Sequence, residues 1–298
     1  MLIIIPLLAP VLMISMIIYQ KRSDMRNQCL LLFMLVLSIA YLAIWKPFTP
    51  ATQVFILTAA TVIIPVITLV VIIINYFSGG QTTNTGNYRM EIKRKLFHLV
   101  GFLVFIPPAV VWMSYISAIY GFTSLSGITT SKYNQGYYSF VIFLITYSLL
   151  ILFVTIEYIR LTYKPDLFTQ LLREKESDRI ASYIYTATSI YIISLLFFPY
   201  DNIVCAAIAM GLLSDLAACI VGKKLRKIAY KDRSLEGFLA NFITGSIVGY
   251  FFVGIIAILV ALAIATVDFL NGALELRIND NLLFPLLAAT LLWFLLVY

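Results

Sequence analysis

Long apolar stretches, separated by short polar loops, run along the whole chain. Runs of roughly 17 or more residues without a charged side chain recur from one end to the other, as long as a helix that crosses a bilayer. Strands of a membrane barrel would instead appear as short alternating segments. The pattern predicts an all-α, polytopic integral membrane protein with about nine transmembrane helices, within a range of about eight to ten. The expected spans are residues 2–19, 29–45, 54–77, 96–120, 137–160, 182–199, 202–222, 238–267 and 282–298.

One of these spans is too long for a single upright helix. The segment Phe238–Val267 carries no charged residue and would be about 45 Å long as a helix, against a hydrocarbon core of roughly 30 Å. It is either one tilted helix or two shorter helices broken near Gly249 or Gly254. The two alternatives place the C-terminus on opposite sides of the membrane.

Composition and charge fit a membrane protein whose loops differ in charge. The chain is 62% hydrophobic and 12% charged, whereas a soluble domain is about 25% charged. Nearly all of the 21 lysine and arginine residues lie in the alternate loops 20–28, 78–95, 160–181 and 223–237. The positive-inside rule places these loops in the cytoplasm and the N-terminus outside. The net charge of +7 then belongs to one membrane face, where it sets orientation and contacts anionic lipid, so we expect no nucleic-acid partner.

The first polar cluster is the segment EIKRKLFH, residues 91–98. On a helix, Glu91, Lys95 and His98 share a face, and Arg94 lies one turn before the histidine. The cluster is either part of a site or only the charged start of a helix, with an interfacial histidine whose hydrogen bonds are satisfied.

A second cluster closes the fifth span. Glu157 and Arg160 begin inside apolar sequence, and an amphipathic segment that contains DLFTQLLREKESDR follows them. An i, i+3 ion pair beside a helix on the membrane surface would explain most of these charges.

The third cluster, SDLAACIVGKKLRKIAYKDRSLEG, carries a carboxylate well inside an apolar helix. Asp215 costs roughly 2.5–3.5 kcal/mol to insert at the centre of a membrane, so an interaction must offset that cost. Ala217, Ala218 and Gly222 keep the helix slim, so a neighbour or ligand can approach it closely. Either a divalent cation with a polyphosphate stabilises Asp215, or a hydrogen bond to another helix does.

The basic loop after Asp215 leads into a helix start suited to phosphate. Ser234 is a plausible N-cap of the next helix, and Glu236 follows two residues later rather than the three of a capping box. A helix N-terminus beside lysines binds phosphate readily, and Mg²⁺ usually binds one or two carboxylates together with substrate phosphates.

These segments resemble a known family, the CTP-dependent polyprenol kinases, which include dolichol kinase, phytol kinase and CTP-dependent diacylglycerol kinase. EIKRKLFH is similar to the family motif E-x-x-R-K-x-x-H, and SDLAACIVGKKLRK with RSLEG is similar to its G-D-A-x-A-x-x-x-G-R-x-x-G and K-S-x-E-G elements. INDNLLFPLL resembles its D-N-x-x-x-P-L segment. The resemblance covers residues 88–298 as a catalytic domain and leaves three expected helices in residues 1–87 outside it.

The resemblance implies transfer of the γ-phosphate of CTP, with Mg²⁺, to a lipid alcohol in the bilayer such as dolichol, phytol or another isoprenoid alcohol. It assigns functional positions to Lys95, His98, Asp215, Ser234, Glu236 and Gly237. The chain departs from the motifs at Ser214 and Arg226, where the family has glycine, and at Arg233, where it has lysine. Arginine keeps the charge but meets phosphate as a planar fork.

Residue roles follow from the needs of phosphoryl transfer, which are positioning and charge neutralisation. We expect Asp215, with Glu236, to hold Mg²⁺, and His98 or Asp215 to take the proton of the lipid hydroxyl, with Lys95 beside His98. The nucleotide would be bound by cationic side chains and by amides of the helix start. The expected nucleotide-binding residues are Arg94, Lys223, Lys224, Lys231, Arg233, Ser234, Glu236 and Gly237.

Two other classes of function stay open. A cytidylyltransferase that makes a CDP-lipid would use similar metal and CTP contacts, and a small-solute transporter would also carry charges in its spans, though with inverted repeats. For the kinase we expect a multi-pass protein of a prokaryotic or archaeal cell membrane (the endoplasmic reticulum if eukaryotic), with its site facing the cytoplasm.

Overall fold

The protein is described by a computed structural model at residues 32, 137–163, 180–197, 200–225, 227–231, 233–274 and 278–297. These residues are almost all helical. They belong to two compact units: residue 32 and the described residues of 141–196 lie in the first, and residues 137–140 with the described residues after 196 lie in the second. The expected spans before residue 137 and the segment 91–98 lie outside the described residues, so the total of about nine helices stays a prediction.

The first unit contains helix α6 (Ser182–Leu196) and helix α5 (Tyr137–Tyr163) apart from its first four residues. Both helices were expected, although α6 ends three residues before the predicted limit at residue 199. Aromatic rings join them: Phe153 meets Tyr183 edge-on at 5.3 Å, and the rings of Tyr147 and Tyr191 lie 6.4 Å apart.

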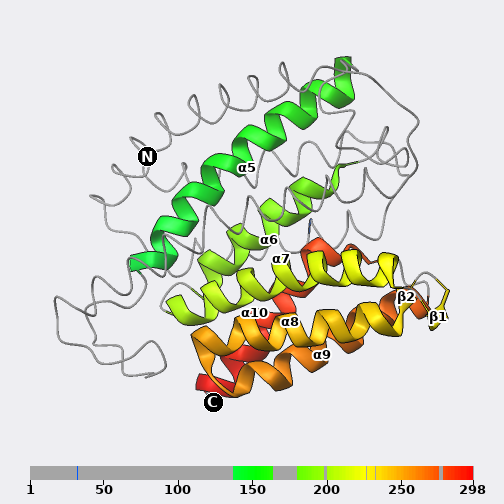
Figure 1. Cartoon of the computed structure of the whole chain (residues 1–298). Coiled ribbons are helices and arrows are strands. Elements are labelled where there is room, and N and C mark those ends of the chain that lie inside the picture. Colours follow the sequence, from blue (N-terminus) through cyan, green and yellow to red (C-terminus); the bar gives the residue numbers. More distant parts are fainter. Residues whose placement is uncertain are drawn as a thin grey trace. The chain divides into compact units, whose positions relative to one another are not determined.

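From residue 197 on, the described residues of the second unit form four helices and one small hairpin (Figure 1). The helices are α7 (Asp201–Lys224), α8 (Leu235–Val253), α9 (Ile256–Ala273) and α10 (Asp280–Val297), each long and apolar enough to cross a membrane. Strands β1 (Ala229–Tyr230) and β2 (Arg233–Ser234) pair in an antiparallel register between α7 and α8. The predicted helical membrane architecture is therefore confirmed for this part of the chain.

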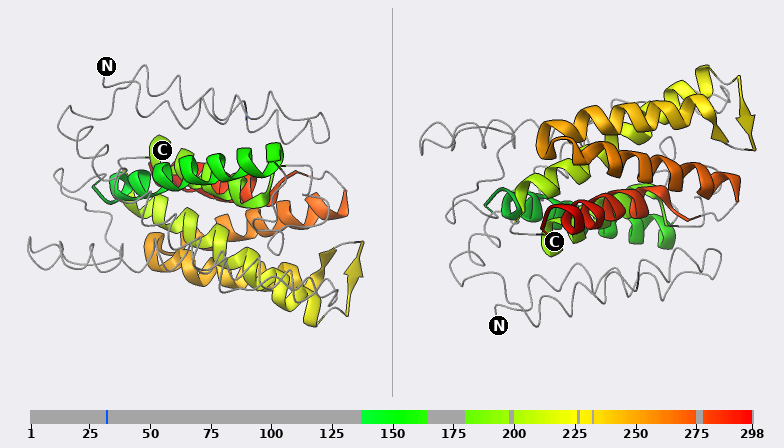
Figure 2. Two further views of the ribbon diagram at one scale, coloured as in Figure 1. Left: turned by 90° about the horizontal axis from the view of Figure 1, so that it is seen from above. Right: turned by 90° about the horizontal axis from the view of Figure 1, so that it is seen from below.

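The long apolar run is two helices, broken at Gly254. This glycine has φ of 68° and ψ of −150° between the end of α8 and the start of α9, and its N–H donates to the carbonyl of Tyr250 (3.0 Å). The two helices lie side by side, with β1 and β2 extending from one end (Figure 2). Because α10 starts at that same end, its last turn lies at the opposite end, away from the basic loop (Figure 1). Of the two alternatives that the sequence left open for this run, the structure therefore has the one with two helices.

Glycines on one face of α8 allow its close packing. Gly237, Gly245 and Gly249 are buried along one stripe. A Cβ atom on Gly249 would lie 2.7 Å from Sδ of Met210 on α7 and 2.8 Å from Cβ of Ala257 on α9. Small residues promote helix association in lipid, because dispersion contacts rather than burial from water hold such helices together.

Replacing Gly254 with alanine is expected to destabilise the protein by roughly 1–3 kcal/mol, because its φ and ψ lie in a region that is nearly exclusive to glycine. No atom lies within 4 Å of the added Cβ, so the cost comes from the backbone alone. Unfolding of the purified protein in detergent micelles measures it. Ile255→Ala, at the exposed neighbouring position, is the control. Equal stability of Gly254→Ala and the wild type would contradict the prediction.

Candidate functional site

Buried polar side chains of the second unit gather at the end that carries β1 and β2. They come from the second half of α7, the first half of α8, the last part of α9 and the first turn of α10. We call this region the polar end. Its buried members among the described residues are Ser214, Asp215, Ser234, Asn241, Asp268, Asn271 and Asn281. Four helices thus contribute buried polar groups to one end of the unit.

Asp215 is 5% exposed and lies on a helix of membrane length, as the sequence predicts. Next to it, the hydroxyl of Ser214 donates to the carbonyl of Met210. One turn earlier, Gly211 packs against Pro285 of α10, whose Cγ lies 2.6 Å from the position of an added Cβ. The DNLLFPL segment therefore packs beside the helix that carries Asp215.

The start of α8 is capped as the sequence predicts. Oγ of Ser234 accepts from the N–H of Gly237 (3.1 Å) and donates to the carbonyl of Gly222 (3.3 Å). A Cβ on Gly222 would lie 3.2 Å from Cα of Gly237, so the two glycines let the end of α7 meet the start of α8.

Glu236 organises the basic turn before β1. Its Oε1 accepts from the N–H groups of Lys227 (3.2 Å) and Ile228 (3.0 Å), and the N–H of Leu235 donates to the carbonyl of Ile228 (3.0 Å). Its Oε2 is buried without a hydrogen-bond partner among the described residues. Since the amides of Leu235 and Gly237 already have acceptors, a phosphate at this turn would be held mainly by side chains rather than by the helix start.

The pairing of α7 with α8 separates Asp215 from Glu236. Gly222 is level with Gly237, whereas Ser214 is level with Gly245. The backbone positions of Asp215 and Glu236 are therefore about 12 Å apart along the helix pair, at a rise of about 1.5 Å per residue. In the part of the chain that the structure describes, no three His, Cys, Asp or Glu side chains form a metal-binding group. Because Mg²⁺ usually binds one or two carboxylates together with substrate phosphates, Asp215 fits it as a carboxylate ligand, and Glu236 as a second ligand stays a prediction.

Lysines bring positive charge to the polar end. Lys223 and Lys224 close α7 and are exposed, and Lys231 is exposed in the hairpin turn with φ of 51°. Their exposure suits contact with a soluble anion.

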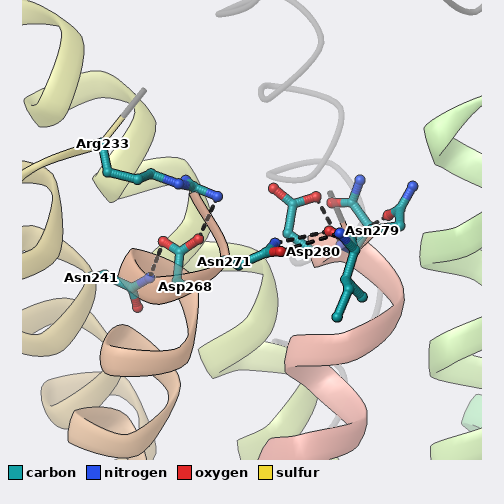
Figure 3. Close-up of polar contacts among 8 residues, drawn as sticks. Arg233, Asn241, Asp268, Asn271, Asn279 and Asp280 are labelled. Carbon is teal, nitrogen blue, oxygen red and sulfur yellow. Dashed lines mark hydrogen bonds and ion pairs between the residues drawn. The ribbon is translucent and has the colours of Figure 1, made fainter. Parts of the chain in front are cut away.

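An ion pair that the sequence analysis did not identify lies beneath the hairpin (Figure 3). Nη2 of Arg233 lies 2.6 Å from Oδ1 of Asp268, and Nδ2 of Asn241 donates to Oδ2 of the same carboxylate (3.0 Å). Asp215 and Asp280 are close enough to interact electrostatically with Asp268. The sequence holds one signal for this pair: Asn241 is an isolated asparagine in the apolar run 238–267, and Asp268 directly follows that run.

Asn271 fixes the connection from α9 to α10. Its Nδ2 donates to the carbonyl of Ile278 (2.9 Å), and its Oδ1 accepts from the N–H of Ile278 (3.1 Å). The N–H of Asn281 then donates to the side chains of Asn279 (3.1 Å) and Asp280 (2.9 Å), as Figure 3 shows. These contacts hold the first turn of α10 at the polar end.

The expected residues Arg94, Lys95 and His98 lie outside the described residues, so their place in this site stays a prediction.

The pair Glu157–Arg160 forms a separate cluster in the first unit. Glu157 is fully buried and accepts from Nε (2.9 Å) and Nη2 (2.8 Å) of Arg160. It also accepts from the N–H of Ala181 (2.8 Å) and the hydroxyl of Tyr183 (2.6 Å). The i, i+3 ion pair that the sequence suggested is present, but it is buried rather than exposed at a membrane surface.

Comparison with known proteins gives one partial match. The chain is 37% identical over 125 residues to a protein of Methanocaldococcus jannaschii that is described as uncharacterized. The match covers 42% of this chain and 63% of that protein. No protein-family model matches the chain. No solved structure matches it either.

Proposed function

We propose that the protein is a membrane lipid kinase that transfers the γ-phosphate of CTP to a polyprenol or related isoprenoid alcohol. The observation that carries the proposal is Asp215, a buried carboxylate within a helix of membrane length, at the same end as a lysine-rich turn. The motif resemblance supplies the donor and the acceptor class.

Phosphoryl transfer depends on positioning and on neutralising negative charge. Mg²⁺, when bound, would neutralise charge on the triphosphate, and Asp215 fits as its carboxylate ligand. Lys223, Lys224 and Lys231 would contact the phosphates together with Arg233. His98 or Asp215 would accept the proton of the lipid hydroxyl as the oxygen attacks phosphorus.

The acceptor alcohol would arrive from the bilayer. Large apolar side chains are exposed along α8 and α9, where they suit lipid contact; they include Ile243, Ile247, Phe251, Leu259 and Leu262. A lipid whose hydroxyl lies at the membrane surface would then reach the polar end without leaving the membrane.

The proposal includes a topology. With α8 and α9 as separate spans, the nine expected spans become ten transmembrane helices, with the polar end in the cytoplasm and both termini outside. The membrane would be the cell membrane of a prokaryote or archaeon.

The test is an assay of the purified protein in lipid micelles with CTP labelled at the base or at the γ-phosphate. Acceptors are a panel of prenols, phytol and diacylglycerol. We expect labelled phosphate on a lipid alcohol and release of CDP. Release of pyrophosphate with a cytidine-labelled lipid would replace the kinase with a cytidylyltransferase. No lipid product with any nucleotide would overturn both enzymes and favour a transporter.

A further inference from the structure

Helix α9 is shaped around the side chain of Arg233. A Cβ on Gly272 would lie 2.6 Å from Nε and 2.9 Å from Cδ of Arg233, and closer still to its Cγ. The arginine stem therefore crosses the helix where a side chain is absent. One turn earlier, Asp268 receives the guanidinium.

The carboxylate that holds Arg233 is itself fixed. Asp268 is 4% exposed, and Asn241 on α8 donates to its second oxygen. Two helices thus contribute three residues, Asn241, Asp268 and Gly272, which we call the Arg233 cradle. Figure 3 shows Arg233 extending toward Asp268, with Asn241 beside it.

Arg233 also keeps part of its binding capacity. Its side chain is 27% exposed, and among the described residues its ion pair with Asp268 uses Nη2, one nitrogen of a guanidinium that has five N–H donors. A lysine in the same cradle would offer one point charge, which the carboxylate and the phosphate would have to share. A planar fork can contact a carboxylate on one side and a phosphate on another.

We propose that Asn241, Asp268 and Gly272 are positioning residues that hold Arg233 in place for a phosphate group of the nucleotide. This inference rests on the proposed function. It also makes a claim independent of catalysis, namely that Gly272 and Asp268 act through the Arg233 side chain.

The first experiment is a mutant cycle at Gly272 on the full chain. In the wild-type background, Gly272→Ala should lower the unfolding temperature and raise the KM for CTP roughly tenfold, the size expected for loss of one charge-assisted contact. In the Arg233→Ala background, the same change should leave the unfolding temperature unchanged or higher. The clashing atoms are then gone, and alanine favours helix over glycine. Equal losses in both backgrounds would overturn the cradle.

The second experiment tests the carboxylate. Asp268→Asn should lower the unfolding temperature and raise the KM for CTP more than it lowers kcat. In the Arg233→Ala background it should raise the unfolding temperature, because it removes a buried charge that has lost its ion-pair partner. Thr266→Ala, at an exposed position of α9, is the control and should change neither value. Arg233→Lys should keep part of the affinity for CTP, so its KM for CTP should rise less than that of Arg233→Ala.

A binding measurement separates this inference from the kinase proposal. Inorganic tripolyphosphate should raise the unfolding temperature of the wild type, and this shift should be lost in Arg233→Ala and Asp268→Asn. If both variants lose this shift and the wild type phosphorylates no lipid, the anion site is supported and the kinase proposal is overturned. An unchanged shift in both variants, alongside normal kinase activity, would leave the kinase standing and overturn the role of Arg233.

Discussion

Asp215→Asn is expected to abolish phosphoryl transfer while the protein stays folded and inserted in the membrane. Asparagine has nearly the same size but lacks the charge that binds Mg²⁺. Replacing a residue that only hydrogen-bonds to a metal ligand typically lowers activity about tenfold to a hundredfold. Because Asp215 would itself be the ligand, we expect turnover to fall by more than about a hundredfold. Insertion should become easier, because a carboxylate inside a membrane helix is costly.

The matched control is Asp201→Asn, at the first turn of the same helix and at the end away from the polar end. It removes the same charge from α7 and should leave turnover nearly unchanged. Lipid phosphorylation with labelled CTP and the unfolding temperature in detergent are measured for both variants. Wild-type turnover in Asp215→Asn would make Asp215 a structural hydrogen-bonding group, the alternative that its sequence position already allowed.

The sequence located the helices of the second unit well, because hydrophobic length is a direct requirement of the bilayer. It did not distinguish the two glycines at which the long run might break. Gly249 is a packing contact between three helices, whereas Gly254 has the positive φ of the turn. Both occur as single glycines in apolar sequence, and only the backbone conformation separates their roles.

The candidate site was predicted in part. Asp215 and Ser234 stand out because a charge in an apolar run and an N-cap are local signals. Asp268 and Asn241 were missed because their contact joins residues on two helices, 27 positions apart. The register of α7 against α8 is likewise invisible in the sequence, although it sets how far apart the backbone positions of Asp215 and Glu236 lie.

Glu157→Ala is expected to lower the free energy of unfolding by about 3–5 kcal/mol. This is the usual cost of removing one partner of a buried ion pair. Glu157 accepts four hydrogen bonds from three residues. Its removal takes this carboxylate from a guanidinium that is only 4% exposed and leaves the N–H of Ala181 without its acceptor. Denaturant unfolding of the purified protein in mixed micelles measures the loss.

A double variant decides whether charge or packing causes that loss. Glu157→Leu combined with Arg160→Met removes both charges and keeps most of the side-chain volume. It should recover much of the stability lost in Glu157→Ala, because apolar replacement of a buried ion pair is often neutral or stabilising. Tyr183→Phe removes one donor to the same carboxylate and should cost less, about 1.5–3 kcal/mol, the range for one hydrogen bond to a charged group. A double variant as unstable as Glu157→Ala would show that the cost comes from the link to the amide of Ala181 and from packing. Glu157 would then tie the start of α6 to α5 rather than neutralise Arg160.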